Sequence, residues 1–170
     1  MSASQELWRQ FWIFQANPKQ YDALSQLKVD QAIDWTVSRF IDRYREGDIV
    51  YLWIAGEQAG IYGWAEVQGE VFLDDQGKQR LTAVYRGVLN KPLEKSFLRS
   101  QPKVFDGLSI LRNPTGANFR VTVLEAIELN RLINENGDTL PPDPDQQEDP
   151  NAPGEMYSKA VYVLDYRFDS

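Results

Sequence analysis

The sequence of 170 residues predicts an α+β fold organised around one hydrophobic hairpin. Residues 49–54 and 60–67 are two hydrophobic runs of strand length, and Gly56 in the turn between them suits a position of positive φ. Strict alternation along the second run places apolar side chains on both faces, so we expect a central strand covered on both sides. Gly60 and Gly63 leave room on this strand for a close approach, by a neighbouring backbone or by a flat ligand. Short amphipathic stretches elsewhere predict helices around the hairpin.

The first third of the chain predicts another buried strand and a helix. Residues 7–16 are dense in apolar and aromatic side chains and end at Asn17 and Pro18. Pro18 suits the first turn of a helix that Asn17 would cap. The apolar residues of that helix follow at three-residue spacing: Tyr21, Leu24 and Leu27. Residues 33–39 predict an extended segment, and the basic residues 39–45 form either a helical turn or a strand-like loop.

The middle and the last third alternate between extended and helical patterns. Two extended stretches, 70–73 and 81–89, flank a turn at 74–77, and we expect the Lys91-Pro92 pair to end the second stretch. The further elements expected are short helices at 94–100 and 105–111, a strand at 119–123 and a helix at 124–134. We expect this last helix to bury a stripe formed by Leu124, Ile127 and Ile133.

Charge divides the chain into three parts. The formal net charge is −7, but residues 137–155 hold six acidic residues and no basic one, so the remainder has 18 basic and 19 acidic residues. We expect a domain over 1–136, an acidic, proline-rich linker over 137–156 and a C-terminal strand over 157–170. That strand would pack on the domain or on a partner protein.

Composition excludes several classes of function. The chain has neither cysteine nor histidine, so we expect no disulfide, no ordinary zinc site and no cofactor. Serine–histidine and cysteine–histidine catalysis are also excluded, which favours a protein that is not an enzyme. Because no apolar run reaches the length of a membrane span and no signal peptide is visible, we expect no membrane partner and a cytoplasmic location.

Aromatic residues predict a binding pocket. The chain has five tryptophans, and Trp35 stands outside any long apolar run, between a polar stretch and a basic one. A tryptophan in such a place either stacks a planar ligand or packs in the core. Asn17 either reads a base edge or only caps a helix, and Arg39 either binds a phosphate or is a solvated charge. Arg43 and Arg45 extend this basic cluster into a rim for a nucleic-acid strand.

Motifs along the chain resemble the EVE domain family. They are FWIFQANP at 11–18, WTVSR at 35–39, GDIVYLWIAG at 47–56, AGIYG at 59–63 and GANFR at 116–120. This resemblance covers roughly residues 8–135 and implies a PUA-like fold, a curved mixed β-barrel with flanking helices. It also implies a reader of modified, typically methylated, bases in DNA or RNA. The ligand-binding residues expected on these grounds are Asn17, Trp35, Val37, Arg39, Trp53, Gly60 and Gly63.

Two other functions stay open at this point. One is a protein-interaction module that works through its C-terminal strand and has a vestigial pocket. The weaker one is an enzyme on a modified nucleoside with carboxylates such as Asp34 or Glu66. The base-reader hypothesis expects Trp35→Ala to abolish binding while thermal stability stays nearly unchanged.

Overall fold

The computed structural model describes residues 9–19, 22–101, 103–142 and 144. Residues 10–142 form one structural unit. The strands of this unit are β1 (Phe11–Ala16), β2 (Ala32–Thr36), β3 (Ile49–Ile54), β4 (Gly60–Leu73), β5 (Gln79–Glu94) and β6 (Asn118–Val121). The helices are α2 (Ala23–Gln26), α3 (Lys95–Arg99), α4 (Ser109–Arg112), α5 (Val123–Glu135) and the 3₁₀ helix η1 (Lys103–Gly107). The C-terminal strand expected at 157–170 lies outside the described residues.

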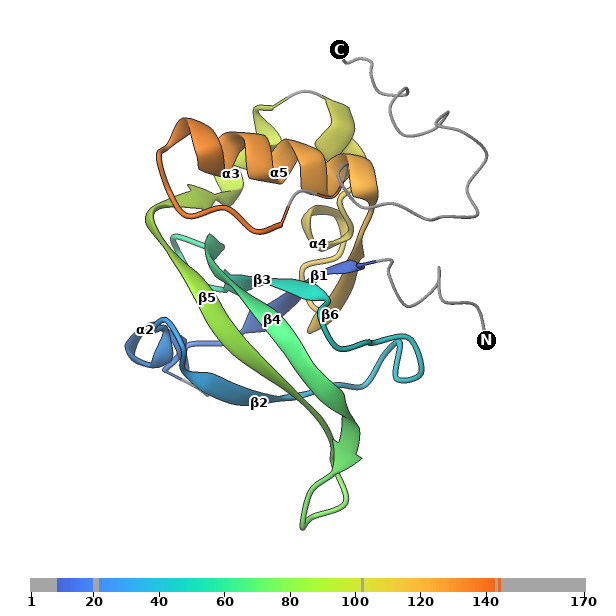
Figure 1. Cartoon of the computed structure of the whole chain (residues 1–170). Coiled ribbons are helices and arrows are strands. Elements are labelled where there is room, and N and C mark those ends of the chain that lie inside the picture. Colours follow the sequence, from blue (N-terminus) through green and yellow to red (C-terminus); the bar gives the residue numbers. More distant parts are fainter. Residues whose placement is uncertain (1–8, 20–21, 102, 143, 145–170) are drawn as a thin grey trace, which may run out of the picture. The chain divides into compact units, whose positions relative to one another are not determined.

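The six strands form one mixed sheet in the order β2-β5-β4-β3-β1-β6 (Figure 1). β1 pairs in parallel with β3, and the other pairs are antiparallel. β2 and β6 are the edges, and within the described residues no ladder joins them, so the expectation of a closed barrel is wrong. The Asn118 side-chain oxygen instead accepts a hydrogen bond of 3.1 Å from the Ser38 N–H. A side chain of β6 thus contacts the segment that follows β2.

The central hairpin is confirmed, with changes in detail. All six residues of β3 are buried, which places this strand at the centre, and Gly56 has the expected positive φ, at 128°. β5 does not end at Lys91-Pro92 but continues to Glu94. Pro92 is tolerated there because the ladder between β4 and β5 shifts register between Val88 and Leu93.

The helix expected after Pro18 is reduced to one turn, α2. Its N-cap is Asp22, whose carboxylate accepts a hydrogen bond from Ser25 N–H, so the prediction that Asn17 caps this helix is wrong. Leu24 is 58% exposed, whereas Leu27 is buried. Tyr21 lies outside the described residues.

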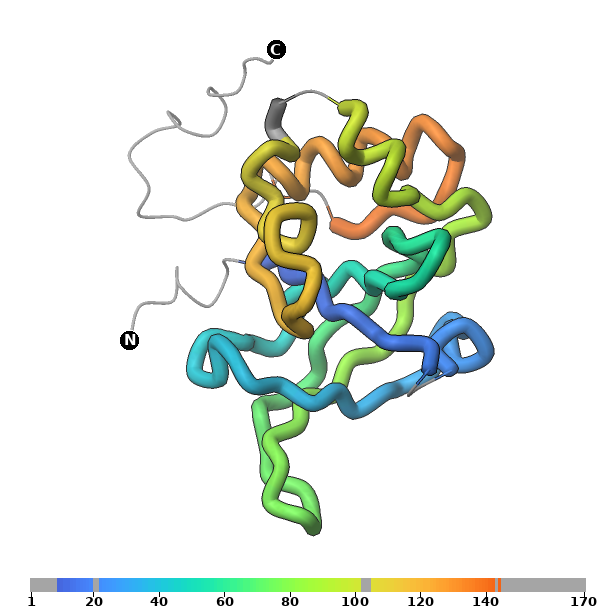
Figure 2. The backbone as a smooth tube through the Cα atoms, turned by 180° about the vertical axis from the view of Figure 1, so that it is seen from behind, coloured from blue at the N-terminus to red at the C-terminus, as the bar shows by residue number. Residues whose placement is uncertain are grey.

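The two faces of the sheet bury separate hydrophobic clusters. The helix-side cluster contains side chains from α3, η1, α4 and α5. These helices lie on one side of the strands (Figure 2). Its strand residues are Phe11, Ile13, Ile49, Tyr51, Trp53, Ile61, Trp64, Leu89, Leu93, Phe119 and Val121. The inner cluster lies on the opposite face, where the sheet curls around its own side chains. Its strand residues are Trp12, Phe14, Ala16, Trp35, Val50, Leu52, Ile54, Ala65, Val67, Leu81, Ala83 and Tyr85.

α5 covers the helix-side cluster. Thr122 and Glu125 form a capping box at its start, because each side chain accepts the backbone N–H of the other residue. The expected apolar stripe is displaced: Leu124 is 58% exposed, and the helix buries Ala126, Leu129, Leu132 and Ile133. Of the predicted stripe, Ile133 is therefore confirmed as buried, Ile127 is half-buried, and only Leu124 faces solvent.

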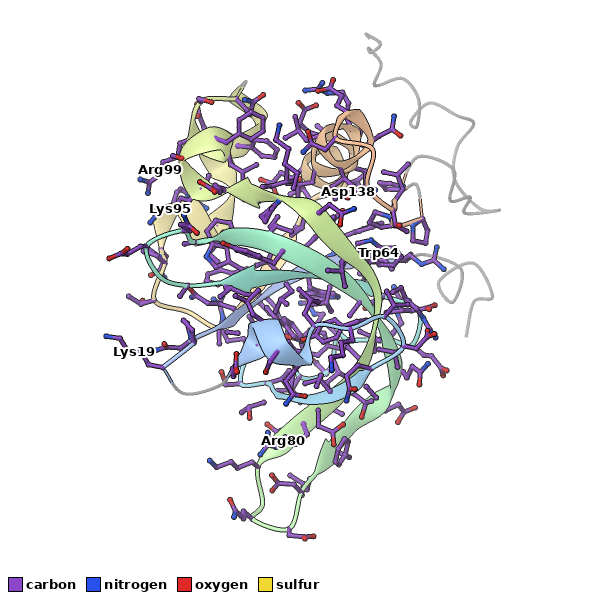
Figure 3. All side chains as sticks on the ribbon, turned by 90° about the vertical axis from the view of Figure 1, so that its left-hand side faces the viewer. Lys19, Trp64, Arg80, Lys95, Arg99 and Asp138 are labelled. Atoms are coloured by element: carbon purple, nitrogen blue, oxygen red, sulfur yellow. The ribbon has the colours of Figure 1, made fainter. Side chains whose placement is uncertain are left out.

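The segment after α5 packs against the sheet. The Asp138 carboxylate accepts hydrogen bonds from the backbone N–H groups of Asn90 (2.9 Å) and Lys91 (3.1 Å). The Trp64 indole N–H donates to the Thr139 carbonyl at 3.0 Å, and Trp64 and Asp138 lie close together in Figure 3. Residues 138–142, which composition assigns to the acidic linker, thus contact the sheet and α5.

Candidate nucleic-acid interface

Trp35 lies on an edge strand with its ring in the inner cluster. β2 pairs Trp35 with Leu81 of β5, and alternation directs Trp35 inward while Asp34 and Thr36 stay exposed. Trp35 is 9% exposed, and its ring meets Phe14 edge-on at a centroid distance of 5.7 Å. The side chain therefore packs as a core residue, and truncation to alanine should lower the free energy of unfolding by about 3 kcal/mol. The expectation of unchanged stability does not fit this burial.

A chain of ring contacts leads from Trp35 to the basic loop 39–47. Phe14 meets Tyr44 at 5.6 Å, Tyr44 meets Trp12 at 4.6 Å and Trp12 meets Phe40 at 5.2 Å. The Tyr44 hydroxyl donates to the Arg39 carbonyl at 2.8 Å. Burial raises the pKa of Tyr44 well above its usual value, so this hydroxyl stays protonated as a donor. The loop that follows β2 is thus tied to the same aromatic cluster as Trp35.

Asp48 anchors the end of this loop to Gln10 and Trp12. The carboxylate is 1% exposed and accepts hydrogen bonds from four donors: Gln10 N–H (3.1 Å), Gln10 Nε2 (2.9 Å), the Trp12 indole N–H (3.0 Å) and Arg45 N–H (3.0 Å). Burial raises the pKa of Asp48, and these hydrogen bonds oppose the shift. Gln10 Nε2 also donates to the Arg43 carbonyl at 2.6 Å. Hydrogen bonds therefore fix the backbone at Arg39, Arg43 and Arg45.

The arginine side chains are distributed over two sides of the loop. Arg39 and Arg43 are exposed, and the Arg39 guanidinium lies 4.7 Å from the centre of the Phe40 ring. Arg45 is half-buried and lines a groove together with Asp42 and Glu46, so it departs from the predicted rim.

Arg120 of β6 is a cation near this site that the sequence did not single out. Its guanidinium lies 5.4 Å from the centre of the Trp12 ring. Asn118, two residues earlier, bonds to Ser38, the neighbour of Arg39. Arg39 thus follows the edge strand β2, and Arg120 lies on the other edge strand, β6. The sequence signal that could have found it is a single charged residue between two apolar ones, Phe119 and Val121, and the structure exposes it while the other residues of the strand are buried.

Val37 lies on the same side of the sheet as Trp35, and Asn17 lies at the end of β1. Val37 is 2% exposed in the inner cluster, and its N–H donates to the Gln79 carbonyl at 3.0 Å. Asn17 directly follows β1 and is exposed. Its side-chain oxygen accepts the Lys19 N–H at 3.0 Å, which forms a local turn.

The structure separates Trp53 from Trp35 and packs Gly60 and Gly63 against a neighbouring strand. Trp53 is 2% exposed and belongs to the helix-side cluster, on the opposite face of the sheet. At Gly60 and Gly63 a side chain would collide with backbone oxygens of β5, those of Leu93 and Gly87. The close approach that these glycines permit is therefore that of a neighbouring strand. Their assignment to a ligand stays a prediction, and the packing gives it no support.

Two further properties of the described residues bear on function. They contain no group of three or more side chains arranged to hold a metal ion. None of their helices combines the length and the apolar character that crossing a bilayer requires.

Comparison with known proteins reports on the fold. The sequence matches no family model and no curated protein. Among solved structures, Atu2648 from Agrobacterium tumefaciens has a TM-score of 0.64 at 17% identity, over 82% of this chain and 99% of that one. PSPTO5229 from Pseudomonas syringae has a TM-score of 0.62 at 13% identity, over 72% and 99% of the two chains.

Human THYN1 protein, solved in complex with DNA containing 5-methylcytosine, has a TM-score of 0.57 at 10% identity, over 75% of this chain and 98% of that one. Such low identities establish the fold alone. The resemblance stated from the sequence motifs is confirmed at this level: the chain has the PUA-like fold of the EVE and DUF55 proteins.

Proposed function

We propose that this protein binds nucleic acid without catalysis and accommodates a modified, typically methylated, base beside Trp35. The observation that carries the proposal is the place of Trp35 on the edge strand of an open sheet, with Arg39 following β2 and Arg120 on the other edge strand, β6. A base would enter between β2 and β6, next to the contact between Ser38 and Asn118. The structural neighbour THYN1, solved with 5-methylcytosine DNA, supports this class of ligand.

Stacking alone does not supply the free energy that is needed to extrude a base from a duplex and bind it. An aromatic side chain contributes about 1–3 kcal/mol per stacked base, and extrusion of a base from a duplex costs a few kcal/mol. Trp35 is 9% exposed, so stacking requires that binding uncover its ring, and the gain from stacking is offset by the cost of extrusion. Phosphate contacts by Arg39, Arg43 and Arg120 would supply the remaining favourable energy, and the Asn17 amide would read the base edge.

The test is a titration of short fluorescein-labelled oligonucleotides, followed by fluorescence anisotropy. Single-stranded and duplex DNA and single-stranded RNA each carry methylated cytosine, methylated adenine or no modification. Trp35→Leu is compared with Trp64→Leu, a matched change of a buried tryptophan in the helix-side cluster. Circular dichroism at the assay temperature verifies that both variants are folded.

We expect the full chain to prefer one modified oligonucleotide. Trp35→Leu should weaken that complex by about 5- to 100-fold, which corresponds to the loss of one stacked base, whereas Trp64→Leu should leave it unchanged. Equal affinity for modified and unmodified strands would exclude a base reader. An equal loss in both variants would exclude the specific role of Trp35.

A further inference from the structure

β4 and β5 extend beyond the rest of the sheet as a two-stranded arm, residues 68–80. β3 pairs with β4 only as far as Glu66, and β2 pairs with β5 as far as Arg80. From Gln68 to Leu73, β4 therefore has a partner strand on one side only among the described residues. Figures 1 and 2 show this arm projecting from the end of the sheet opposite the helices.

A groove of about 500 Å³ separates the arm from the loop 39–47. Its loop wall consists of Ile41, Asp42, Tyr44, Arg45 and Glu46, and its arm wall of Glu70, Val71, Phe72, Leu73 and Gln79. This volume suits several side chains of a bound segment.

The groove combines apolar walls with negative charge. Phe72 and Leu73 are 40% and 67% exposed although both are large apolar residues. Asp42, Glu46 and Glu70 contribute three carboxylates to the lining against the one guanidinium of Arg45. A nucleic-acid backbone would bring its phosphates against these carboxylates, whereas a cationic and apolar segment complements the groove in both respects.

The turn of the arm is rigidly built around Asp74. Its carboxylate accepts the N–H groups of Gln76 (2.9 Å) and Lys78 (2.8 Å) and pairs with Arg80 Nε at 2.8 Å. The Arg80 hydrogen bond, above all, lowers the pKa of Asp74, so the carboxylate keeps these bonds well below neutral pH. Figure 3 labels Arg80 in the arm. A preformed arm loses little conformational entropy when a partner binds.

We propose that this groove docks an extended segment of a partner protein in which a large apolar side chain is flanked by lysine or arginine. The apolar side chain occupies the space between Tyr44 and Phe72, and the flanking cations face Glu46 and Glu70. This interaction surface is separate from the interface at Trp35 and does not depend on nucleic-acid binding. The loop 39–47 would then contribute to both surfaces. Arg39 and Arg43 would contact nucleic acid, and Asp42 and Glu46 would contact the partner protein.

The probe is a randomised 12-residue peptide display library, selected on the full chain and counter-selected on a variant with Glu70→Lys and Phe72→Ser. Both residues are exposed, so the variant should fold. A matched control carries the same two types of substitution outside the groove, Glu57→Lys and Leu124→Ser, at positions that are also exposed. One enriched peptide is then synthesised and titrated, and amide chemical shifts map its site.

We expect the enriched peptides to share a large apolar residue beside lysine or arginine. The chosen peptide should bind the groove variant at least tenfold more weakly than the wild type and the matched control equally well, and its shifts should gather at 41–46 and 70–79. No enrichment, equal binding to the groove variant, or shifts elsewhere would overturn the proposal. Perturbation of the groove by the modified oligonucleotide, or self-association that the groove variant abolishes, would assign the groove to nucleic acid or to a second copy and equally overturn it.

Discussion

Two aspartates organise two neighbouring segments of this protein in different ways. Asp48 is buried and joins the loop 39–47 to Gln10 and Trp12, which are 38 and 36 residues away in the chain. Asp74 is half-buried on the arm and bonds within six residues of itself. Burial raises the pKa of the first, and the hydrogen bond from Arg80 lowers the pKa of the second.

The difference shows how a carboxylate can serve the whole fold or only a local turn. The partners of Asp48 include Trp12 of β1 and the inner cluster, and Gln10 directly before β1, so its loss should be felt by the entire domain. The partners of Asp74 belong to one hairpin end, so its loss should loosen the arm and leave the domain intact. Nucleic-acid binding would depend on the first anchor and peptide docking on the second.

The largest expected effect comes from Asp48→Asn. All four partners of this carboxylate are donors, so the amide nitrogen of asparagine would face an N–H group and leave a buried donor unsatisfied. We expect the free energy of unfolding in urea to fall by about 2–3 kcal/mol. Asp42→Asn, an exposed change in the same loop, is the control and should alter stability by less than about 0.5 kcal/mol. Equal stability of the two variants would refute the anchoring role.

The second effect concerns the salt dependence of oligonucleotide binding. Replacement of Arg39 or Arg120 by glutamine should reduce the slope of log K against log salt by about 1 each, as for one lost phosphate contact. Arg99→Gln, on α3 at the helix side of the sheet (Figure 3), should leave the slope unchanged. A slope that is the same in all three variants would place the phosphates elsewhere.

Asp74→Asn should have a smaller effect on the domain. Its hydrogen bonds are solvent-exposed, so we expect the free energy of unfolding to change by less than about 1 kcal/mol. Amide hydrogen exchange should nevertheless accelerate at 74–80 and remain unchanged in β3. The neighbouring exposed change Asp75→Asn should leave exchange in the arm slow. Faster exchange in β3 would show that the arm is coupled to the core, so that Asp74 does not stabilise the arm alone.

The smallest effect is a difference in pH dependence. The raised pKa of Asp48 means that the native state binds its proton more tightly than the unfolded state. The contribution of Asp48 to stability is therefore full below the usual carboxyl range, declines as pH rises to the raised pKa and is constant above it. Asp74 has the opposite sign, because its contribution is present above the usual range and is lost as pH falls through the lowered pKa. Carboxyl ¹³C shifts during a pH titration should give midpoints on opposite sides of that range; the reverse order would contradict both assignments.

Local signals in the sequence were sufficient for most of the fold. Six consecutive apolar residues predicted β3, and the turn residues around Asp74 predicted the hairpin end. Strict alternation along β4 failed because register shifts interrupt its pairing with β5. Ile61 and Trp64 consequently both face the helix-side cluster although they are three residues apart. A bulge leaves no reliable mark in a run that is apolar on both faces.

The site could be predicted only in part. Trp35 stood out because of its polar neighbours, and it lies on the edge strand at the proposed interface. Trp53 and Trp35 lie on opposite faces of the sheet. Both faces of β3 are buried, so alternation alone cannot predict which face of this strand points toward the helices. The anchoring role of Asp48 was out of reach, since its partners in β1 become neighbours only when the sheet forms.

Gly87 restricts how relatives of this protein can vary. A side chain at this position would overlap the Trp64 indole, which lies opposite in the ladder. That indole also holds the Thr139 carbonyl, so a smaller residue at position 64 would release the segment after α5. Positions 64 and 87 should therefore covary: a tryptophan with glycine, or a smaller residue with a side chain at 87 and a segment held in another way. Position 139 contributes only its backbone carbonyl and should vary freely, a pattern that an alignment of relatives would reveal.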